Sequence, residues 1–409
     1  MHEKKKYIFL FNTVGGSAGG QLYLSSKVEW LQSLGWEVDV FYFDKVPVAI
    51  ENLRQFEKNY IRNLEFRFGQ LNKKERTDTL KSLNLNEKSY DKIIIESFSI
   101  EMALWGEYIA SKIKATHICY LLSEKYSSTF SESVLKFLRH KLNQKKLYGI
   151  TPKTIPMILP EANGEETFLR APGCVRESED LPLPSVLDSL NREGYTILSI
   201  GRLEKPYIKD LFKEVRRFAQ GKSHPVNFII IGDTKDKRLL QSLHSITDDQ
   251  ENLIPYYLKE VFPLPRKIFE ISDVFVGCAG SVKMAVREGV PAISIDAFDH
   301  HGIGILGETT ENALYRSKNE PPLIISELLE KIYKEREERK KKKETFKRIS
   351  VLPDFTKHGA VMEMPGQEEY YDTTKVKNGK LFTFAYQLIK AIGGKSFLYS
   401  LKKLKHRFK

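Results

Sequence analysis

The chain alternates between short apolar segments and amphipathic segments, and this alternation constrains its fold more than any other feature. "YIFLFNTV" (7–14) is typical of a buried strand, residues 22–35 carry leucine and valine at helical spacing, and "WEVDVFYF" (36–43) is typical of the next strand. Strands that are apolar on both faces and joined through a helix belong to parallel sheets covered by helices. The chain therefore opens with a strand-helix-strand unit of an α/β fold.

The alternation continues, stops and then restarts. "YDKIIIES" (90–97), "THICYLL" (116–122) and "LYGIT" (147–151) complete a first series of strands. Proline, glycine and acidic residues dominate from 152 to 184, where no hydrophobic period persists. "YTILSIGRL" (195–203) then opens a second series that ends with "PAISID". Two such series with a break between them indicate two domains of the same type.

The predicted architecture is α/β, with two Rossmann-like doubly wound domains facing a cleft and a basic amphipathic helical tail. The length of 409 residues suits two domains rather than one. The expected divisions are an N-terminal domain at 1–155, an interdomain connection at 156–193, a second domain at 194–350 and a tail at 351–409 that is helical from about residue 380.

The net charge of +12 is concentrated at the end of the chain. Residues 373–409 contain ten Lys and Arg and no Asp or Glu, so only +2 of the net charge belongs to the other 372 residues. A protein that tracks nucleic acid phosphates carries its basic residues along a folded surface. The nearly neutral body therefore argues against nucleic acid as a partner.

The basic tail has the pattern of a membrane-surface helix. Residues 395–409 combine Phe and Leu at helical spacing with Lys and Arg, and each Lys or Arg near an anionic lipid surface contributes about 1 kcal/mol. The alternative is a final helix whose apolar stripe packs on the protein. No apolar run reaches the roughly 18 residues that a membrane span needs, and three widely spaced cysteines fit a reducing cytosol. We expect a cytoplasmic protein, peripheral at the inner face of the cell membrane.

Glycine-bearing turns after the strands are the candidate binding sites, because ligands of such sheets bind beyond the carboxyl ends of the strands. The first turn carries Gly15, Gly16, Gly19 and Gly20 directly before a helix. Glycines allow backbone N–H groups to approach an anion at the positive end of that helix. The match to the dinucleotide-binding pattern is imperfect, and a purely structural tight turn is the alternative interpretation.

Two further turns belong to the second domain. Arg202 and Lys205 follow a strand, with Lys209 at the start of the next helix, and this combination of a rigid fork and movable point charges suits a diphosphate. A solvated strand end is the alternative. Gly280 and Ser281 stand where another helix begins; the serine can cap the helix, and free N–H groups there bind an anion.

In order and spacing, these segments resemble the GT-B glycosyltransferases, particularly the family 4-like group that includes bacterial capsule and lipopolysaccharide enzymes. The resemblance covers about residues 5 to 335. It rests on "GGQLYLSSKVEWLQSLGWEVDVF", "ILSIGRLEKPYIKDL", "FIIIGD", "IFEISDVFVGC" and "AVREGVPAISID".

The resemblance implies transfer of a sugar from a nucleotide-sugar to an acceptor, with the first domain binding the acceptor and the second binding the nucleotide. Arg202 with Lys205 or Lys209 would then neutralise the diphosphate leaving group, and Gly280 and Ser281 would meet it with backbone dipoles. It also implies no metal and no cofactor beyond the nucleotide-sugar co-substrate, because these donors do the work of a cation.

Two acidic residues of the family pattern are replaced. Met284 stands where many relatives carry a glutamate that holds the nucleotide ribose, and Gly277 stands where retaining relatives carry another. Two substitutes are available: Glu308, in a glycine-bearing segment beyond the last strand, and Glu288, one helical turn after Met284. Glu308 is preferred, because a loop at the strand ends faces ligand.

A catalytic base is expected from the first domain. Glu124, after the strand "THICYLL", would accept the acceptor's proton in an inverting reaction, although a plain salt-bridging glutamate is the alternative. Glu96, at the end of "KIIIES", is a second candidate, and His117 is expected to be buried structure.

The combined prediction is a metal-independent glycosyltransferase of the hexosyltransferase type that uses a UDP- or GDP-linked sugar. The expected acceptor is a glycan or glycolipid in bacterial surface polysaccharide synthesis, such as a lipid-linked polysaccharide intermediate, met at the membrane through residues 395–409. Two alternatives remain: a nucleotide-sugar epimerase of the same build, and a degenerate transferase that serves as a membrane-docked partner.

Overall fold

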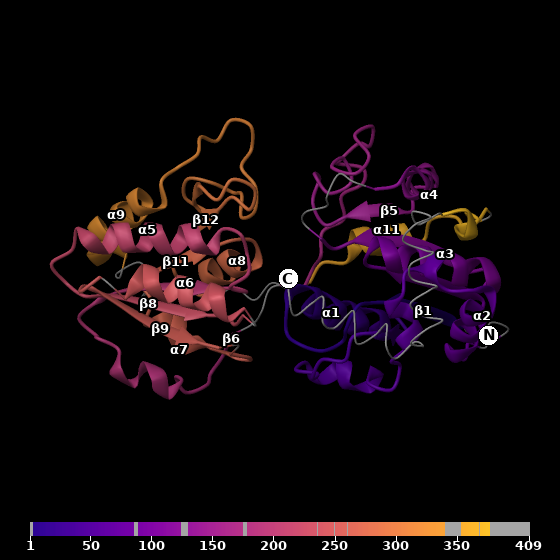
Figure 1. Cartoon of the computed structure of the whole chain (residues 1–409), viewed down its shortest axis with the longest axis horizontal. Helices are drawn as coiled ribbons and strands as arrows, with labels where there is room; N and C mark the ends of the chain where they lie inside the picture. Colours follow the sequence, from indigo (N-terminus) through magenta and orange to yellow (C-terminus); the bar gives the residue numbers. More distant parts are fainter. Residues whose placement is uncertain are drawn as a thin grey trace. The chain divides into compact units, whose positions relative to one another are not determined.

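The structure is a computed structural model in which the chain divides into two compact units (Figure 1). Unit 1 is Met1–Gly173 together with the chain from Pro353, and unit 2 is Cys174–Leu352. Each unit is built on one main sheet, so the predicted α/β class with two doubly wound halves is confirmed. The residues that the structure describes are 3–85, 89–123, 130–174, 178–234, 236–248, 250–259, 261–339, 353–367 and 369–376.

Unit 1 contains a five-stranded sheet whose strands are all parallel. The strand order is β2-β1-β3-β4-β5, so the chain runs from β1 to one side and then returns to the other. Ile8 of β1 lies opposite Asp39 of β2 and Ile95 of β3. The strands are β1 (Lys5–Leu10), β2 (Glu37–Phe41), β3 (Lys92–Ser97), β4 (Thr116–Leu121) and β5 (Leu147–Gly149).

Helices cover both faces of this sheet. Alternate strand residues such as Ile95 and Cys119 pack with α3 and α4. On the opposite face, Tyr120 of β4 contacts the rings of Tyr23 on α1 and His358 on α11. The α-helices are α1 (Gly19–Ser33), α2 (Lys73–Ser82), α3 (Ile100–Ile113), α4 (Glu132–Asn143) and α11 (Thr356–Met362), and the 3-10 turns are η1 (Glu51–Phe56), η2 (Arg62–Glu65), η3 (Phe68–Gln70) and η6 (Thr373–Lys375).

Unit 2 contains a six-stranded sheet with one antiparallel strand. Its order is β13-β12-β11-β7-β8-β9, and β13 alone runs against its neighbour. The strands are β7 (Tyr195–Ile200), β8 (Val226–Ile231), β9 (Leu253–Leu258), β11 (Val274–Gly277), β12 (Ala292–Ile295) and β13 (Gly302–Ile305), and the short strands β6 (Ser178–Glu179) and β10 (Leu264–Pro265) pair separately.

The two-residue period of the strands divides the core of unit 2 into two layers. Ile197 and Val276 pack with α5, α6 and α9, whereas Leu198 and Phe275 pack with α7 and α8. Figure 1 shows α5 and α9 on one side of the sheet and α7 on the other. The helices are α5 (Ile208–Gln220), α6 (Lys237–Thr247), α7 (Arg266–Glu270), α8 (Gly280–Arg287) and α9 (Ile325–Lys334), with the 3-10 turn η5 (Ser185–Ser189).

The unit boundaries differ from those expected from the sequence. Ile155 and Leu159 are fully buried in the core of unit 1, and Leu187 is buried in the core of unit 2. Much of the expected connection at 156–193 therefore belongs to one unit or the other, and the chain passes from unit 1 to unit 2 after Gly173. The absence of hydrophobic periodicity did not identify the domain boundary, because irregular turns can still bury single apolar residues in a core.

The segment 353–376 returns to unit 1 and completes a buried polar network there. The Glu96 carboxylate accepts hydrogen bonds from Tyr7 at 2.5 Å and Tyr23 at 3.1 Å, and it pairs with Lys27 at 2.5 Å. Lys27 also donates to Nδ1 of His358 on α11 at 3.1 Å, and Nε2 of His358 donates to the Arg170 carbonyl at 2.7 Å. The ammonium of Lys27 and the carboxylate of Glu96 are almost fully enclosed.

A second buried network lies on the opposite face of the same sheet. Glu107 accepts hydrogen bonds from His117 Nδ1 at 2.8 Å, from Lys141 at 3.0 Å and, through its other oxygen, from Gln367 at 2.8 Å. The Ser97 hydroxyl lies 2.9 Å from His117 Nε2. Burial would raise the pKa of Glu107, but the His117 hydrogen bond and the Lys141 charge outweigh it and lower that pKa to about 2. His117 is fully buried, as expected from the sequence.

The predicted tail helix from about residue 380, including the membrane-surface segment 395–409, lies outside the described residues. None of the helices in the described ranges has the length and apolarity that a membrane span requires.

The two buried histidines predict a loss of stability in mild acid. Burial, assisted by nearby lysine charges, lowers the pKa of His117 to about 4 and of His358 to about 2, from 6.5. Between pH 6.5 and about 4 the unfolded chain therefore binds protons that the native protein does not, and stability present above pH 6.5 is lost as the pH falls. We expect the free energy of unfolding to fall by about 1.4 kcal/mol per pH unit for each histidine.

Urea unfolding at several pH values checks this prediction. His358→Gln is expected to reduce the slope of stability against pH, whereas His301→Gln, at an exposed histidine of unit 2, should leave it unchanged. Equal slopes for wild type and His358→Gln would contradict the assignment.

Candidate active site

The strand order of unit 2 reverses between β7 and β11. From β7 the chain proceeds to β8 and β9 on one side, then crosses to β11 and β12 on the other. In open α/β sheets, ligands bind at such a switch point, beyond the carboxyl ends of the two strands that flank it. The loops that follow β7 and β11 therefore form the candidate site, and these are the two turns that the sequence singled out in the second domain.

The loop after β7 supplies cations. Arg202 and Lys209 are exposed, and neither side chain has a hydrogen-bond or ion-pair partner among the described residues, while Lys205 is half-buried. Glu204 is the one acidic side chain within this loop. Lys209 lies in the first turn of α5, where the helix dipole disfavours a cation unless an anion is also present. The loop is therefore suited to a bound anion.

The loop after β11 supplies a helix start with an unusual backbone. α8 begins at Gly280, and the preceding Ala279 has φ 62° and ψ −127°, a conformation that costs a non-glycine residue about 1–3 kcal/mol. The Ser281 hydroxyl donates to the Cys278 carbonyl at 3.0 Å and does not cap the helix. The cap that the sequence allowed at Ser281 is therefore not formed. Without a side-chain cap, the first N–H groups of α8 remain available to a ligand.

The loop after β12 adds residues that the sequence analysis missed. His300 Nδ1 lies 3.0 Å from the Asp210 carboxylate in the first turn of α5, beside Lys209. The Asp296 carboxylate accepts hydrogen bonds from the backbone N–H groups of Phe298 and Arg316, both at 2.7 Å. The only sequence signal for this loop was a run of Asp and His directly after an apolar strand.

Glu308, preferred as the residue that holds the ribose, lies at the other edge of the sheet. Because β13 is antiparallel to β12, Ile305 pairs with Ile293 and the Leu306 N–H donates to the carbonyl of Ala292, the first residue of β12. Glu308 therefore follows the amino ends of the parallel strands, where it forms a two-pronged ion pair with Arg339. The expectation of a cleft-facing loop at Glu308 is corrected by this strand direction.

The other positions of the family pattern have structural explanations. Met284 is buried in the core between α8 and the sheet. A side chain at Gly277 would place its Cβ 2.8 Å from the Phe275 ring, so that position has no room for a glutamate. Glu288 ends α8, about two turns from the helix start. None of these three positions thus supplies a carboxylate at the carboxyl edge of the sheet, and neither does Glu308.

The glycine turn of unit 1 is held by close backbone contacts. A Cβ on Gly15 would lie 2.1 Å from the Val46 carbonyl oxygen, and Gly16 has φ 78° and donates its N–H to the Pro47 carbonyl at 2.9 Å. Gly19 and Gly20 are the first residues of α1. The first two glycines therefore have a structural role, because only glycine allows this approach.

The two candidate bases have different outcomes. Glu96 is 1% exposed and its carboxylate is engaged by Tyr7, Tyr23 and Lys27, so we assign it to the fold and not to the reaction. Glu124 lies outside the described residues.

Comparison with known proteins identifies the fold of the chain. No protein-family profile matches the chain, and no curated protein matches it in sequence. Among solved structures, a glycosyltransferase from Rickettsia africae aligns with a TM-score of 0.56 at 14% identity over 84% of this chain and 92% of its own. The chain has the GT-B fold.

Two further GT-B structures align over similar lengths. HepE from Anabaena, solved in complex with UDP and glucose, has a TM-score of 0.53 at 14% identity over 83% of this chain and 92% of its own. Sucrose-phosphate synthase from Thermosynechococcus elongatus has a TM-score of 0.55 at 12% identity over 88% of this chain and 97% of its own. At these identities the likeness concerns the fold.

The strained backbone at Ala279 gives a prediction about the stability of the protein. Ala279→Gly should raise the free energy of unfolding by about 1 kcal/mol, because glycine relieves the positive-φ strain and offsets its greater flexibility in the unfolded chain. Ala285→Gly, inside α8, is the control and should lower stability. Chemical denaturation checks both, and a loss of stability in Ala279→Gly would contradict the strain.

Proposed function

We propose that the protein is a glycosyltransferase that takes a sugar from a UDP- or GDP-linked donor held in unit 2. The observation that carries the proposal is the pairing, at one switch point, of the exposed cations Arg202 and Lys209 with the uncapped start of α8. The GT-B fold and the UDP and glucose in the HepE structure support the same donor class.

The chemistry of sugar transfer explains why such a site is needed. The bond between the anomeric carbon and the diphosphate oxygen breaks, and the diphosphate leaves with the electron pair. Negative charge therefore builds on that oxygen as the acceptor hydroxyl forms the new bond. Arg202, Lys205 and Lys209 stabilise this charge together with the N–H groups at Gly280 and Ser281. With these donors, we propose that the reaction is metal-independent and requires no cofactor besides the nucleotide-sugar.

We assign Glu124 of unit 1 as the base that accepts the proton of the acceptor hydroxyl. The acceptor in this proposal is a glycan or glycolipid of bacterial surface polysaccharide synthesis. Residues 395–409 would bring the enzyme to an anionic membrane surface on the cytoplasmic side, because their Lys and Arg attract anionic lipid.

The donor site predicts a specific loss of nucleotide binding. Arg202→Ala should weaken binding of UDP-glucose or GDP-mannose at least tenfold, because a charge-assisted contact to a phosphate is worth about 1.5–3 kcal/mol. Calorimetric titration measures this, with a thermal-shift screen of a nucleotide-sugar panel to choose the donor. Arg217→Ala, which removes an equal charge from the far end of α5, should bind the donor normally.

If Arg202→Ala binds every donor as tightly as wild type, the diphosphate assignment is wrong. If wild type binds no nucleotide-sugar, the chain is not a transferase of this kind. Release of an epimer without transfer to any acceptor would instead support an epimerase.

The proposed base gives a kinetic prediction. Glu124→Gln should lower kcat about 10²–10⁴-fold, the usual contribution of a general base, while donor binding is unchanged. Glu132→Gln, at an exposed glutamate of α4 in the same unit, is the control. The assay measures nucleotide release in the presence of membrane-derived acceptor, and an undiminished kcat in Glu124→Gln would remove the residue from the mechanism.

A further inference from the structure

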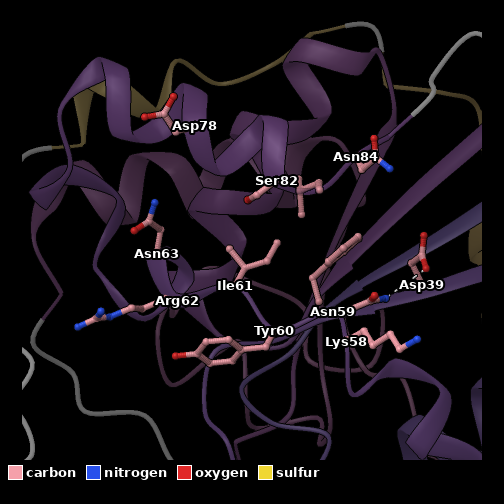
Figure 2. Close-up of a pocket in the computed structure, with 12 residues that line it drawn as sticks. Asp39, Lys58, Asn59, Tyr60, Ile61, Arg62, Asn63, Asp78, Ser82 and Asn84 are labelled. Carbon is pink, nitrogen blue, oxygen red and sulfur yellow. Dashed lines mark hydrogen bonds between the residues drawn. The ribbon is translucent and has the colours of Figure 1, made fainter.

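Unit 1 contains a polar cavity of about 470 Å³ that the donor site does not use. It lies beside β2, which is the edge strand of the unit 1 sheet. Figure 2 shows Asp39 of β2 at one side of the cavity, Asp78 and Ser82 of α2 above it, and Asn59 and Tyr60 along its lower wall. The volume is within the range of small-molecule sites in proteins.

The lower wall is fixed by backbone pairing to the end of β2. Tyr42 donates its N–H to the Asn59 carbonyl at 3.4 Å, and Ile61 donates to the Tyr42 carbonyl at 2.7 Å. The Asn59 amide also donates to the Asp39 carboxylate at 3.3 Å. The Asn63 amide is held by the Thr79 hydroxyl of α2 at 2.9 Å. The polar groups of the wall are therefore oriented before any ligand binds.

The charges of the lining identify the class of ligand. Lys58 and Arg62 oppose a cation, and Asp78 opposes a phosphate or carboxylate. Asp39 adds less to this repulsion, because its carboxylate is ion-paired with Lys6 at 2.6 Å. The remaining polar groups are mainly amides and hydroxyls, which both donate and accept hydrogen bonds. A neutral molecule with many hydroxyl groups matches this mixture, because each hydroxyl also donates and accepts.

Part of this lining is unengaged in the structure. The side chains of Lys58, Asp78 and Asn84 are exposed and have no hydrogen-bond or ion-pair partner within the described residues. Together they offer a cation, an anion and an amide to a ligand, around a cavity whose wall is already ordered. The arrangement resembles a preorganised binding site more than a solvated surface. The polar groups of the wall are fixed by hydrogen bonds, and the three unengaged side chains lie around the opening of the cavity.

The cavity is also connected to the glycine turn of unit 1. The segment after β2 carries the Tyr42 pairing to the cavity wall, and its next residues, Phe43 and Asp44, donate to the Asn12 carbonyl at 3.2 and 2.9 Å. Pro47 of the same segment accepts the Gly16 N–H. One short segment thus separates the cavity from the loop beyond the carboxyl end of β1, where an α/β sheet places its ligands.

We propose that this cavity binds a neutral saccharide unit, at a site separate from the donor site of unit 2. The inference rests on the proposed function in that the saccharide is a part of the acceptor glycan, one that is held away from the reacting hydroxyl. Such a subsite would let the protein select an acceptor by sugars that take no part in the reaction.

Saturation-transfer NMR with the full-length protein tests the proposal, with glucose, galactose, N-acetylglucosamine and lactose as probes and no nucleotide present. We expect at least one to bind with a dissociation constant on the order of 1 mM. The double variant Lys58→Ala, Asp78→Ala should weaken that binding about thirtyfold, because two hydrogen bonds of about 1 kcal/mol each are lost. Ser82→Trp should abolish it by filling the cavity.

The double variant Lys74→Ala, Glu101→Ala is the matched control, because it removes the same two charges from exposed positions on α2 and α3 that do not line the cavity. It should bind the probes as wild type does. Thermal unfolding of every variant shows whether each is folded. If Ser82→Trp does not fold, the double variant Lys58→Ala, Asp78→Ala still tests the proposal.

Three results would overturn the proposal: no probe binds wild type, binding survives in both cavity variants, or binding is lost in Arg202→Ala instead. The proposed function fails separately, when no nucleotide-sugar binds. Because the saccharide probes are tested without nucleotide, binding at the cavity and binding at the donor site are measured independently.

Discussion

The fold of unit 1 depends on two buried carboxylates, one on each face of its sheet. Glu96 pairs with Lys27, and Glu107 pairs with Lys141; the C-terminal segment reaches the first network through His358 and the second through Gln367. Removing one partner of a buried ion pair typically costs about 3–5 kcal/mol, because the other charge is left uncompensated. The segment 353–376 is therefore as much a part of unit 1 as the strands it covers.

These networks also explain why the polar residues that form them are unsuited to chemistry. Ser97, His117 and Glu107 are hydrogen-bonded in the order of a nucleophile, a base and an orienting carboxylate. All three are fully enclosed, so no substrate reaches the serine. Glu96 is excluded from the reaction by the same criterion. By geometry alone, both clusters would be candidate catalytic sites. Their burial indicates instead that they stabilise the fold.

The sequence was informative wherever local pattern determines structure. Apolar strands and helical spacing predicted both sheets, and the turns at Arg202 and Gly280 were placed correctly at the carboxyl ends of β7 and β11. Glu308 was misplaced because the direction of β13 is set by its pairing with β12, which no local pattern encodes. The return of His358 to unit 1 was missed for a similar reason, since a contact 331 residues from Lys27 leaves no periodic trace.

Which charges remain unpaired at the switch point depends on the ion pairs and hydrogen bonds of Asp210, and not only on which residues are present. Asp210 stands beside Lys209 in the first turn of α5, yet its carboxylate is engaged by His300, from the loop after β12, and by Lys213, 3.1 Å away on the same helix. Those hydrogen bonds lower the pKa of Asp210 against the effect of its partial burial. Because the carboxylate is occupied by these partners, Lys209 stays exposed and has no intramolecular counterion among the described residues. The loop after β12 thus shapes the charge of this edge by engaging Asp210, the one acidic side chain in the first turn of α5.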